Sequence, residues 1–246
     1  MRLQGRVAIV TGGAKGIGWG ITQLFAKAGS HIVLIGRSED AIRQAERHLR
    51  DDGIKALACV GDVSKSSDVR QMVAAALQQF GQIDILVNNA GVNPNRGRSV
   101  LDTEEADWDA IMAVNLRGML LCTKAVLPIM KKQRRGHIIN MCSIGGKVIR
   151  DGKNSAYRTS KFGVRGFTWS LAKDVRDDNI SVSAILPGTT QSAMNPNETG
   201  DSSSWLSPND IGEAALFLAT REPNVIIPEM IVAPRSSIGG PTCPYC

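Results

Sequence analysis

The stretch Val7-Ala8-Ile9-Val10-Thr11-Gly12-Gly13-Ala14-Lys15-Gly16-Ile17-Gly18 decides how the rest of the chain is interpreted. Its first four residues are apolar and mostly β-branched, without polar residues alternating between them, which predicts a strand buried on both faces. A glycine-rich turn follows at once. Apolar residues then recur at helical spacing from Ile17 to Phe25, and Gly29 can end that helix. The stretch therefore predicts a strand, a tight turn and a helix in succession.

Such a turn points the free N–H groups and the positive dipole end of the helix at whatever lies above the strand, which favours a phosphate. Gly12, Gly16 and Gly18 let a backbone and a ligand approach each other without an intervening Cβ atom. The spacing is G-x-x-x-G-x-G. Considered alone, it also suits a glycine turn that merely packs a helix on a sheet.

A length of 246 residues is normal for a single α/β domain, so we expect one domain over residues 1–246. With 43% hydrophobic residues the chain can form a large core. No apolar run is expected to reach transmembrane length, and the N-terminus lacks the apolar segment of a signal peptide, so we expect a cytoplasmic protein. The net charge of +6 is spread along the chain. Its one dense run, Lys131–Arg135, falls where a long helix should end, so we expect a solvated helix end and neither nucleic acid nor membrane as a partner.

The five cysteines are an odd number. Cys59, Cys122 and Cys142 lie in apolar stretches and are expected to be small core residues. Cys243 and Cys246 form a C-x-x-C pair that resembles the redox pair of a glutaredoxin, but no helix follows to lower a thiol pKa. We expect an irregular tail over 235–246 and no metal site, with metal or redox use of the pair as the alternative.

Strands and helices alternate along the chain, which predicts a single doubly wound Rossmann domain with a mostly parallel sheet and helices on both faces. The expected strands are residues 7–10, 32–35, 56–60, 85–87, 137–141 and 181–186, with a short last one at 230–232. The segment 189–204 is polar and without periodicity, and we expect it to be a substrate lid.

The end of the second strand bears on the choice of nucleotide. Dinucleotide sites often place an acidic residue about twenty residues beyond the glycine turn, on the ribose 2′-hydroxyl. Here that place holds Gly36 and then Arg37. An arginine would bind a 2′-phosphate, with Lys15 as a second cation, so the preferred cofactor is NADP(H). The alternative is an arginine that simply lies in solvent.

Four further positions indicate chemistry. Tyr157 and Lys161 are four residues apart and so share one helix face, and Ser143 follows the strand at 137–141. Asn115 falls in the middle of a largely apolar helix, where a polar side chain needs a partner. It is either a satisfied core amide or a residue that holds a water near the chemistry.

Taken together, these motifs resemble the short-chain dehydrogenase/reductase family over about residues 5 to 222. The shared motifs are Thr11-Gly12-x-x-x-Gly16-x-Gly18, Asn88-Asn89-Ala90-Gly91, Asn115, Ser143, Tyr157-x-x-x-Lys161 and Pro187-Gly188. The resemblance implies a seven-stranded Rossmann sheet in a homotetramer or homodimer, with subunit contacts through the helices near 104–131 and 155–177.

The resemblance also implies residue roles. Tyr157 would be the general acid/base, Lys161 would lower its pKa and hold the nicotinamide ribose, Ser143 would bind the substrate oxygen, and Asn115 would position a relay water. The implied cofactor-binding positions are Gly12, Lys15, Gly16, Ile17, Gly18, Arg37, Asp62, Val63, Asn89, Ala90, Gly91, Tyr157, Lys161, Pro187, Gly188, Thr189 and Ser192. The segment from Pro228 onward departs from the family pattern, because Pro228 and Pro234 restrict strand pairing.

The expected activity is therefore an NADP-dependent interconversion of a carbonyl and a secondary alcohol in a small-molecule substrate. A 3-oxoacyl thioester reductase is the first candidate and rests on analogy. A sugar or polyol dehydrogenase is the second. A nucleotide-binding sensor without catalysis is the alternative from another class.

Overall fold

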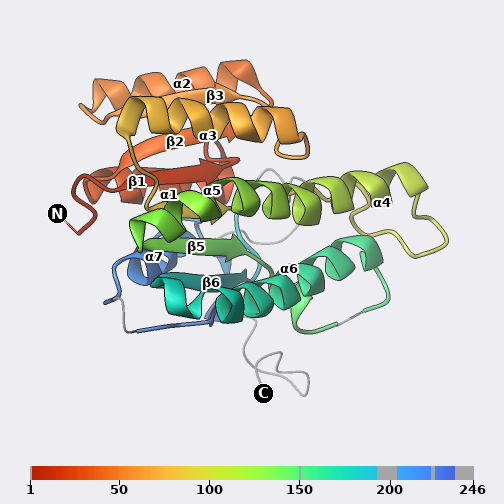
Figure 1. Ribbon diagram of the computed structural model, residues 1–246. Helices are drawn as coiled ribbons and strands as arrows, with labels where there is room; N and C mark the ends of the chain where they lie inside the picture. The colour runs from red at the N-terminus through yellow and green to blue at the C-terminus, as the bar shows by residue number, and fades with distance from the viewer. Residues whose placement is uncertain (1, 150, 193–203, 223–224, 236–246) are drawn as a thin grey trace.

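The computed structural model describes residues 2–149, 151–192, 204–222 and 225–235 (Figure 1). In this part of the chain seven strands form one sheet in the order β3-β2-β1-β4-β5-β6-β7, and every neighbouring pair is parallel. The strands are β1 (Val7–Thr11), β2 (His31–Gly36), β3 (Ala56–Val60), β4 (Ile85–Asn88), β5 (Gly136–Met141), β6 (Ile180–Pro187) and β7 (Glu229–Val232). The predicted seven-stranded Rossmann sheet is confirmed.

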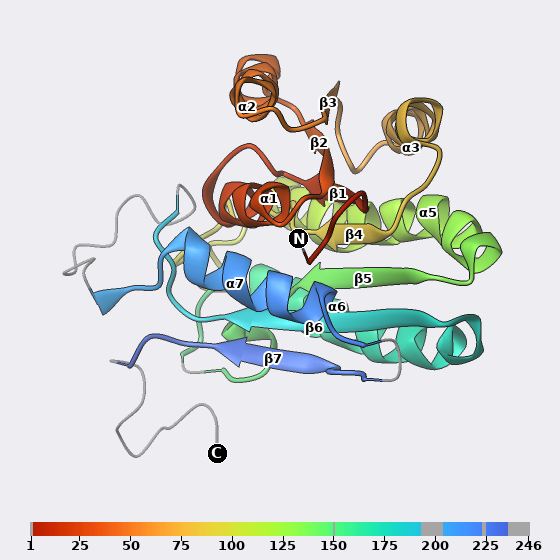
Figure 2. The ribbon, with the colours of Figure 1, turned by 90° about the vertical axis from the view of Figure 1, so that its left-hand side faces the viewer.

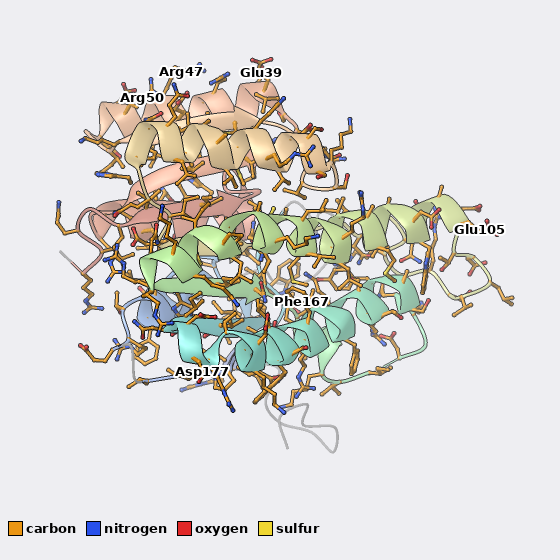
Figure 3. The ribbon with its side chains drawn as sticks, viewed as in Figure 1. Glu39, Arg47, Arg50, Glu105, Phe167 and Asp177 are labelled. Atoms are coloured by element: carbon orange, nitrogen blue, oxygen red, sulfur yellow. The ribbon has the colours of Figure 1, made fainter. Side chains whose placement is uncertain are left out.

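Helices cover both faces of this sheet (Figure 2). One face carries α1 (Gly16–Lys27), α2 (Glu39–Asp51) and α7 (Pro208–Ala219), and the other carries α3 (Ser66–Phe80), α5 (Met119–Gln133) and α6 (Ser155–Asp174). Each helix buries one apolar stripe, as amphipathic spacing predicts. In α2, for example, Ile42 and Leu49 are buried, whereas Glu39 and Arg47 are exposed on the outer side of the helix (Figure 3).

The long helix predicted near 104–131 is interrupted. It consists of α4 (Glu105–Met112), a π-helical turn η1 (Ala113–Gly118) and α5. Such turns are rare and are often found at functional sites. By length and composition the whole helical stretch Glu105–Gln133, with a hydropathy of 1.5, could cross a membrane, contrary to the sequence expectation. In this structure its apolar side chains Val126 and Met130 are buried in the core against the sheet.

The last strand forms despite the two prolines around it. β7 pairs with β6 over Ala184–Pro187, and the two prolines lie just outside the paired residues. The carbonyl of Pro228 accepts a hydrogen bond from the Ala184 N–H group at 2.8 Å. The prolines therefore limit the length of this edge strand without preventing it.

The sequence predicted that the basic run at the end of α5 is a solvated helix end. In the structure two of its cations also form ion pairs. Lys131 lies 3.0 Å from a carboxylate oxygen of Asp178, and Arg135 lies 2.6 Å from one of Asp84. Asp84 is 1% exposed and also accepts a hydrogen bond from the Val7 N–H group. These cations tie α5 to the amino ends of the strands.

The two ends of the predicted lid are joined to each other. Thr190 and Leu206 form a β-bridge, and the Leu206 N–H group donates to the Thr189 carbonyl at 3.1 Å. The middle of the predicted lid (193–203) and the predicted tail from 236 on, with Cys243 and Cys246, lie outside the described residues. Of the remaining cysteines, Cys122 and Cys142 are buried and Cys59 is partly buried.

Candidate active site

The predicted site residues gather at the carboxyl edge of the sheet, where open α/β sheets bind ligands. They follow β1, β2, β3, β4, β5 and β6, or lie on η1 and the first two turns of α6. In Figure 1 this edge is the one toward which the strand arrows point. The fold therefore brings segments far apart in the sequence to one edge.

The glycines of the first turn have two different roles. Gly12 and Gly16 have φ angles of +63° and +52°, a region in which other residues are strained. At Gly18, in contrast, a Cβ atom would lie 2.2 Å from the Gly12 carbonyl oxygen and 2.5 Å from the Asn89 amide nitrogen. Gly18 therefore packs α1 closely against the turn, and its predicted second role in letting a ligand approach stays a prediction.

The N-terminus of α1 has unsatisfied donors. Lys15 is its N-cap residue and makes no side-chain capping bond, and the first turn contains no acidic residue. The first N–H groups of a helix lack partners within the helix. Ser192 lies across from the turn, 3.4 Å from where a Cβ atom on Gly16 would be. This donor set fits the phosphates of a dinucleotide.

Thr11 holds the glycine turn against the end of β4. It was not predicted as a site residue. Its hydroxyl oxygen accepts hydrogen bonds from the N–H groups of Asn89 (3.0 Å) and Ala90 (2.9 Å). The Asn89 side-chain amide donates in return to the Thr11 carbonyl at 2.9 Å. These bonds lock the ends of β1 and β4 together.

Ser143 and Tyr157 form the hydroxyl pair of the site. Ser143 caps the short helix η2 (Ile144–Gly146), accepting a hydrogen bond from the Gly145 N–H group at 3.1 Å. Burial raises the pKa of Tyr157 to about 12, although its hydrogen bond with Ser143 acts in the opposite direction. The family resemblance implied a lowered pKa for Tyr157. Here the desolvation of the phenolate outweighs the stabilising contacts.

Lys161 lies beside this pair. Its Nζ atom donates to the Met141 carbonyl at 2.8 Å and lies 5.6 Å from the centre of the Tyr157 ring. The residue is 4% exposed, and burial lowers the pKa of its ammonium group. The predicted proximity of Tyr157 and Lys161 on one face of α6 is therefore observed.

Asn115 is a satisfied amide. Its Oδ1 atom accepts from the Val92 N–H group (2.8 Å), and its Nδ2 atom donates to the Val92 carbonyl (3.1 Å) and to the Ser160 hydroxyl (3.0 Å). The Ser160 hydroxyl donates to the Tyr157 carbonyl, so Asn115 also braces the turn that carries the tyrosine. Ser160 was missed as a positioning residue, although it stands next to Lys161 in the quoted motif. Gly91 faces both groups: a Cβ atom there would lie 3.8 Å from the Lys161 Nζ atom.

The end of β6 closes the site on the other side. Pro187 pairs with Val232, and the Gly188 N–H group donates to the Val232 carbonyl at 2.8 Å. A Cβ atom on Gly188 would lie 3.1 Å from the Ile144 side chain. The predicted Pro187–Thr189 segment therefore lies next to the helix that Ser143 begins.

The predicted cofactor-binding residues after β2 and β3 have different surroundings. Arg37 is exposed at the end of β2. The Asp62 carboxylate accepts hydrogen bonds from the N–H group (2.9 Å) and hydroxyl (2.8 Å) of Ser64, which stabilise the turn after β3. Val63 is 6% exposed and packs on Gly118, as a core residue does. In the described part of the chain no group of three or more His, Cys, Asp or Glu side chains is placed to hold a metal ion.

A glycine turn with open helix donors, next to a Ser-Tyr-Lys cluster on the same sheet edge, is the arrangement of a dinucleotide-binding oxidoreductase. The sequence profile of the short chain dehydrogenases matches residues 6–202. The chain belongs to this family, and it is an oxidoreductase.

Characterised relatives agree with this assignment. The chain is similar to the 3-oxoacyl-[acyl-carrier-protein] reductase FabG of Thermotoga maritima, with 36% identity over 79% of this chain and 78% of the relative. It is also similar to the oxidoreductase UcpA of Salmonella typhimurium, with 38% identity over 78% of this chain and 72% of the relative.

Two solved structures have the same fold. One is a metagenomic short-chain oxidoreductase in complex with NADP, with a TM-score of 0.83 and 33% identity over 95% of this chain and 99% of that one. The other is a short chain dehydrogenase from Burkholderia cenocepacia in complex with NADP, with a TM-score of 0.86 and 27% identity over 95% of this chain and 98% of that one.

Proposed function

We propose that this protein uses NADP(H) to interconvert a carbonyl and a secondary alcohol in a small molecule. The observation that carries the proposal is the cluster of Ser143, Tyr157 and Lys161 beside an uncapped helix N-terminus at the glycine turn. A proton donor, a polar group for the substrate oxygen and a nucleotide cradle are the three parts that such a reaction needs.

NADP(H) is the proposed nucleotide for two reasons. Lys15 and Arg37 are exposed cations at the adenosine end of the cradle, and neither position offers an acidic side chain that would repel a 2′-phosphate. Both similar solved structures named above are NADP complexes. The remaining proposed contact positions, some through backbone, are Gly12, Gly16, Ile17, Gly18, Asp62, Val63, Asn89, Ala90, Gly91, Tyr157, Lys161, Pro187, Gly188, Thr189 and Ser192.

When bound, the reduced nicotinamide supplies a hydride to the carbonyl carbon. Ser143 holds the substrate oxygen by a hydrogen bond, and Tyr157 donates its phenolic proton to that oxygen. Burial raises the pKa of Tyr157 to about 12, so the phenol is protonated at neutral pH but is a weaker acid than a free tyrosine, and its reaction depends on a neighbouring cation that stabilises the phenolate. Lys161 stabilises the phenolate that remains. Asn115 holds the turn of α6 that carries Tyr157, and a water bound next to Asn115 would return the proton.

The substrate class is less constrained than the chemistry. Similarity to the Thermotoga maritima reductase favours a 3-oxoacyl thioester, and a sugar or polyol is the second candidate. A sensor that binds NADP(H) without catalysis is a third possibility, but it would not need Ser143, Tyr157 and Lys161 together.

A homodimer or homotetramer is also part of the proposal. Large apolar side chains are exposed on α4, α5 and α6: Trp108, Leu120, Phe162 and Trp169. If these side chains form one apolar patch, that patch would be suited to a contact between subunits. We further propose a cytoplasmic location and no nucleic-acid partner.

The test is an assay of NADPH and NADH oxidation against a panel of ketones, 3-oxoacyl thioesters and sugars. Turnover with a preference for NADPH is expected. Nucleotide binding without turnover of any compound would favour the sensor instead, and salt-sensitive binding to DNA or RNA would point to a different function.

A further inference from the structure

Asn154 is the N-cap residue of α6, but its side chain does not cap this helix. An asparagine in this position commonly accepts a hydrogen bond from the second or third N–H group of its own helix. Asn154 makes no such bond. Its Oδ1 atom instead accepts from the N–H group of Gly97, 57 positions earlier in the chain, at 2.6 Å. The oxygen that could cap α6 therefore holds a distant loop.

The backbone of Asn154 supports the same connection. Its N–H group donates to the Arg98 carbonyl at 3.0 Å, and its own carbonyl accepts from the Arg158 N–H group at 2.9 Å in the first turn of α6. Asn154 has a φ angle of +59°, in the left-handed region that glycine adopts more easily than asparagine. A glycine would suit this backbone better, but it would lack the oxygen that binds Gly97.

The loop that Asn154 holds, residues 91–98, is also linked to the second turn of α6. The Val92 N–H and carbonyl groups bind the side chain of Asn115 at 2.8 and 3.1 Å. That side chain donates to the Ser160 hydroxyl at 3.0 Å, and the hydroxyl donates to the Tyr157 carbonyl at 2.6 Å. The loop is therefore linked to α6 both before and after the tyrosine.

The turn of α6 before Tyr157 depends on this loop for its position. Lys161, one turn further along, is fixed to the end of β5 by its hydrogen bond to the Met141 carbonyl at 2.8 Å. The preceding turn begins at Asn154, whose bonds join it to the loop after β4. Figure 1 shows the start of α6 and the segment leading into α4 at the same end of the molecule. Proton transfer requires the tyrosine hydroxyl within hydrogen-bond reach of the substrate oxygen, so the position of this turn bears on the reaction.

We propose that Asn154 is a positioning residue for the reaction: by binding Gly97, its side chain sets where the Tyr157 hydroxyl lies relative to the substrate. This inference rests on the proposed function, because it concerns the proton donor assigned there. Asn154 acts through the tyrosine and does not itself touch the substrate. The loss of its side chain should therefore lower turnover and leave NADPH binding, which depends on the glycine turn, unchanged.

The test removes the side chain and keeps the backbone conformation. Asn154→Gly loses the acceptor for the Gly97 N–H group, but it accepts the left-handed backbone without strain. It should lower kcat roughly 10–100-fold, because a displacement of about 1 Å can cost about 100-fold in rate. The Kd for NADPH and the urea midpoint should stay close to those of the native protein. Asn154→Asp keeps an acceptor at the same place and should restore kcat to near the native value.

Asn179→Gly is the matched control. Asn179 is also a left-handed asparagine, with a φ angle of +58°, and its side-chain amide donates to the Arg134 carbonyl at 2.9 Å. It lies just before β6, at the amino end of the sheet, and its replacement should leave kcat unchanged. An unchanged kcat in Asn154→Gly, or an equal loss in Asn154→Asp or Asn179→Gly, would overturn the inference and leave the proposed function in place.

A second measurement decides the inference if no compound of the assay panel is turned over, a result that would overturn the proposed function. The chain has two tyrosines, so in a Tyr245→Phe background the absorbance of the phenolate reports Tyr157 alone. Burial raises the pKa of Tyr157 to about 12, and a displaced turn should let water reach the phenol and lower this pKa toward about 10. The phenol should therefore ionise at a lower pH in Asn154→Gly than in the native protein or in Asn154→Asp. Ionisation at the same pH in all three would overturn the positioning role as well.

Discussion

The nucleotide side and the proposed substrate side of the candidate site differ in the groups that form them. On the nucleotide side, Thr11, Gly18 and Asn89 join β1, α1 and β4 through backbone groups and through contacts that leave no room for a methyl group. On the proposed substrate side, residues 91–98 form an irregular segment in which the N–H groups of Val92 and Gly97 donate to the side chains of Asn115 and Asn154. The nucleotide side is a fixed cradle of N–H groups, whereas the substrate side presents side chains.

This difference follows from what each side must recognise. A dinucleotide is the same molecule in every turnover, so donors of the backbone can be arranged for it once. Substrates differ between members of a fold family, and a loop can change its side chains without disturbing the sheet. Mutations on the nucleotide side should therefore affect stability and nucleotide binding together, and those on the substrate side should affect turnover alone.

Tyr157 stands where the two sides meet, and its replacement should have the largest effect. Tyr157→Phe removes the proposed proton donor and should lower kcat about 10²–10⁴-fold, the usual contribution of general acid catalysis. NADPH affinity, measured by fluorescence titration, should stay close to that of the native protein. Thr159→Ala, on the exposed side of the same turn, is the control and should keep the native rate. A fully active Tyr157→Phe variant would refute the proposed acid.

Gly18→Ala tests whether the nucleotide side depends on close packing. The added methyl group would lie 2.2 Å from the Gly12 carbonyl, so the helix must shift, and overpacking of this kind costs about 1–3 kcal/mol in the free energy of unfolding. Urea denaturation should show this loss, and titration should show weaker NADPH binding. Gly152→Ala is the control, because a Cβ atom there meets nothing within 4 Å. Unchanged stability in Gly18→Ala would contradict the packing role.

The same contrast explains what the sequence could predict. The buried strands and the Gly12–Gly18 turn are specified by local pattern, so the sheet and the position of the cradle followed from periodicity and spacing. The proximity of Tyr157 and Lys161 followed from their helical spacing. Residue type alone, however, did not distinguish the two roles, because the role of Gly18 depends on what lies opposite it and the role of Gly16 depends on its own left-handed backbone.

Long-range burial accounts for the remaining differences. The pKa of Tyr157 depends on desolvation by surrounding elements, which no spacing rule contains. The hydrogen-bond partners of the Asn115 amide, Val92 and Ser160, are 23 and 45 residues away in the sequence, so no local pattern identifies them.

Arg37→Asp tests one of the two cationic side chains on the nucleotide side. A charge-assisted hydrogen bond contributes about 1.5–3 kcal/mol, so the ratio of kcat/KM for NADPH over NADH should fall roughly 10–100-fold. Stability should not change, because Arg37 is exposed. Arg47→Asp, an equally exposed change of charge on α2 (Figure 3), should leave the ratio as it was. An unchanged ratio in Arg37→Asp would show that another residue selects the nucleotide.

His137 lies at the amino end of the sheet, opposite the candidate active site. A change there should affect the free energy of unfolding and leave turnover unchanged. Burial lowers the pKa of His137 at the start of β5 to about 4, so the folded protein holds this imidazole neutral, with its Nε2 atom 3.0 Å from the Ser183 hydroxyl. The resulting stability is present above the ordinary pKa of about 6.5 and is lost as the pH falls from there toward 4, amounting to roughly 2 kcal/mol between pH 7 and pH 5. Urea denaturation at both pH values should show this loss, which should be much smaller in His137→Gln. If His137→Gln loses as much stability as the native protein, the acid sensitivity must come from other groups, among them His31, whose pKa is also lowered by burial.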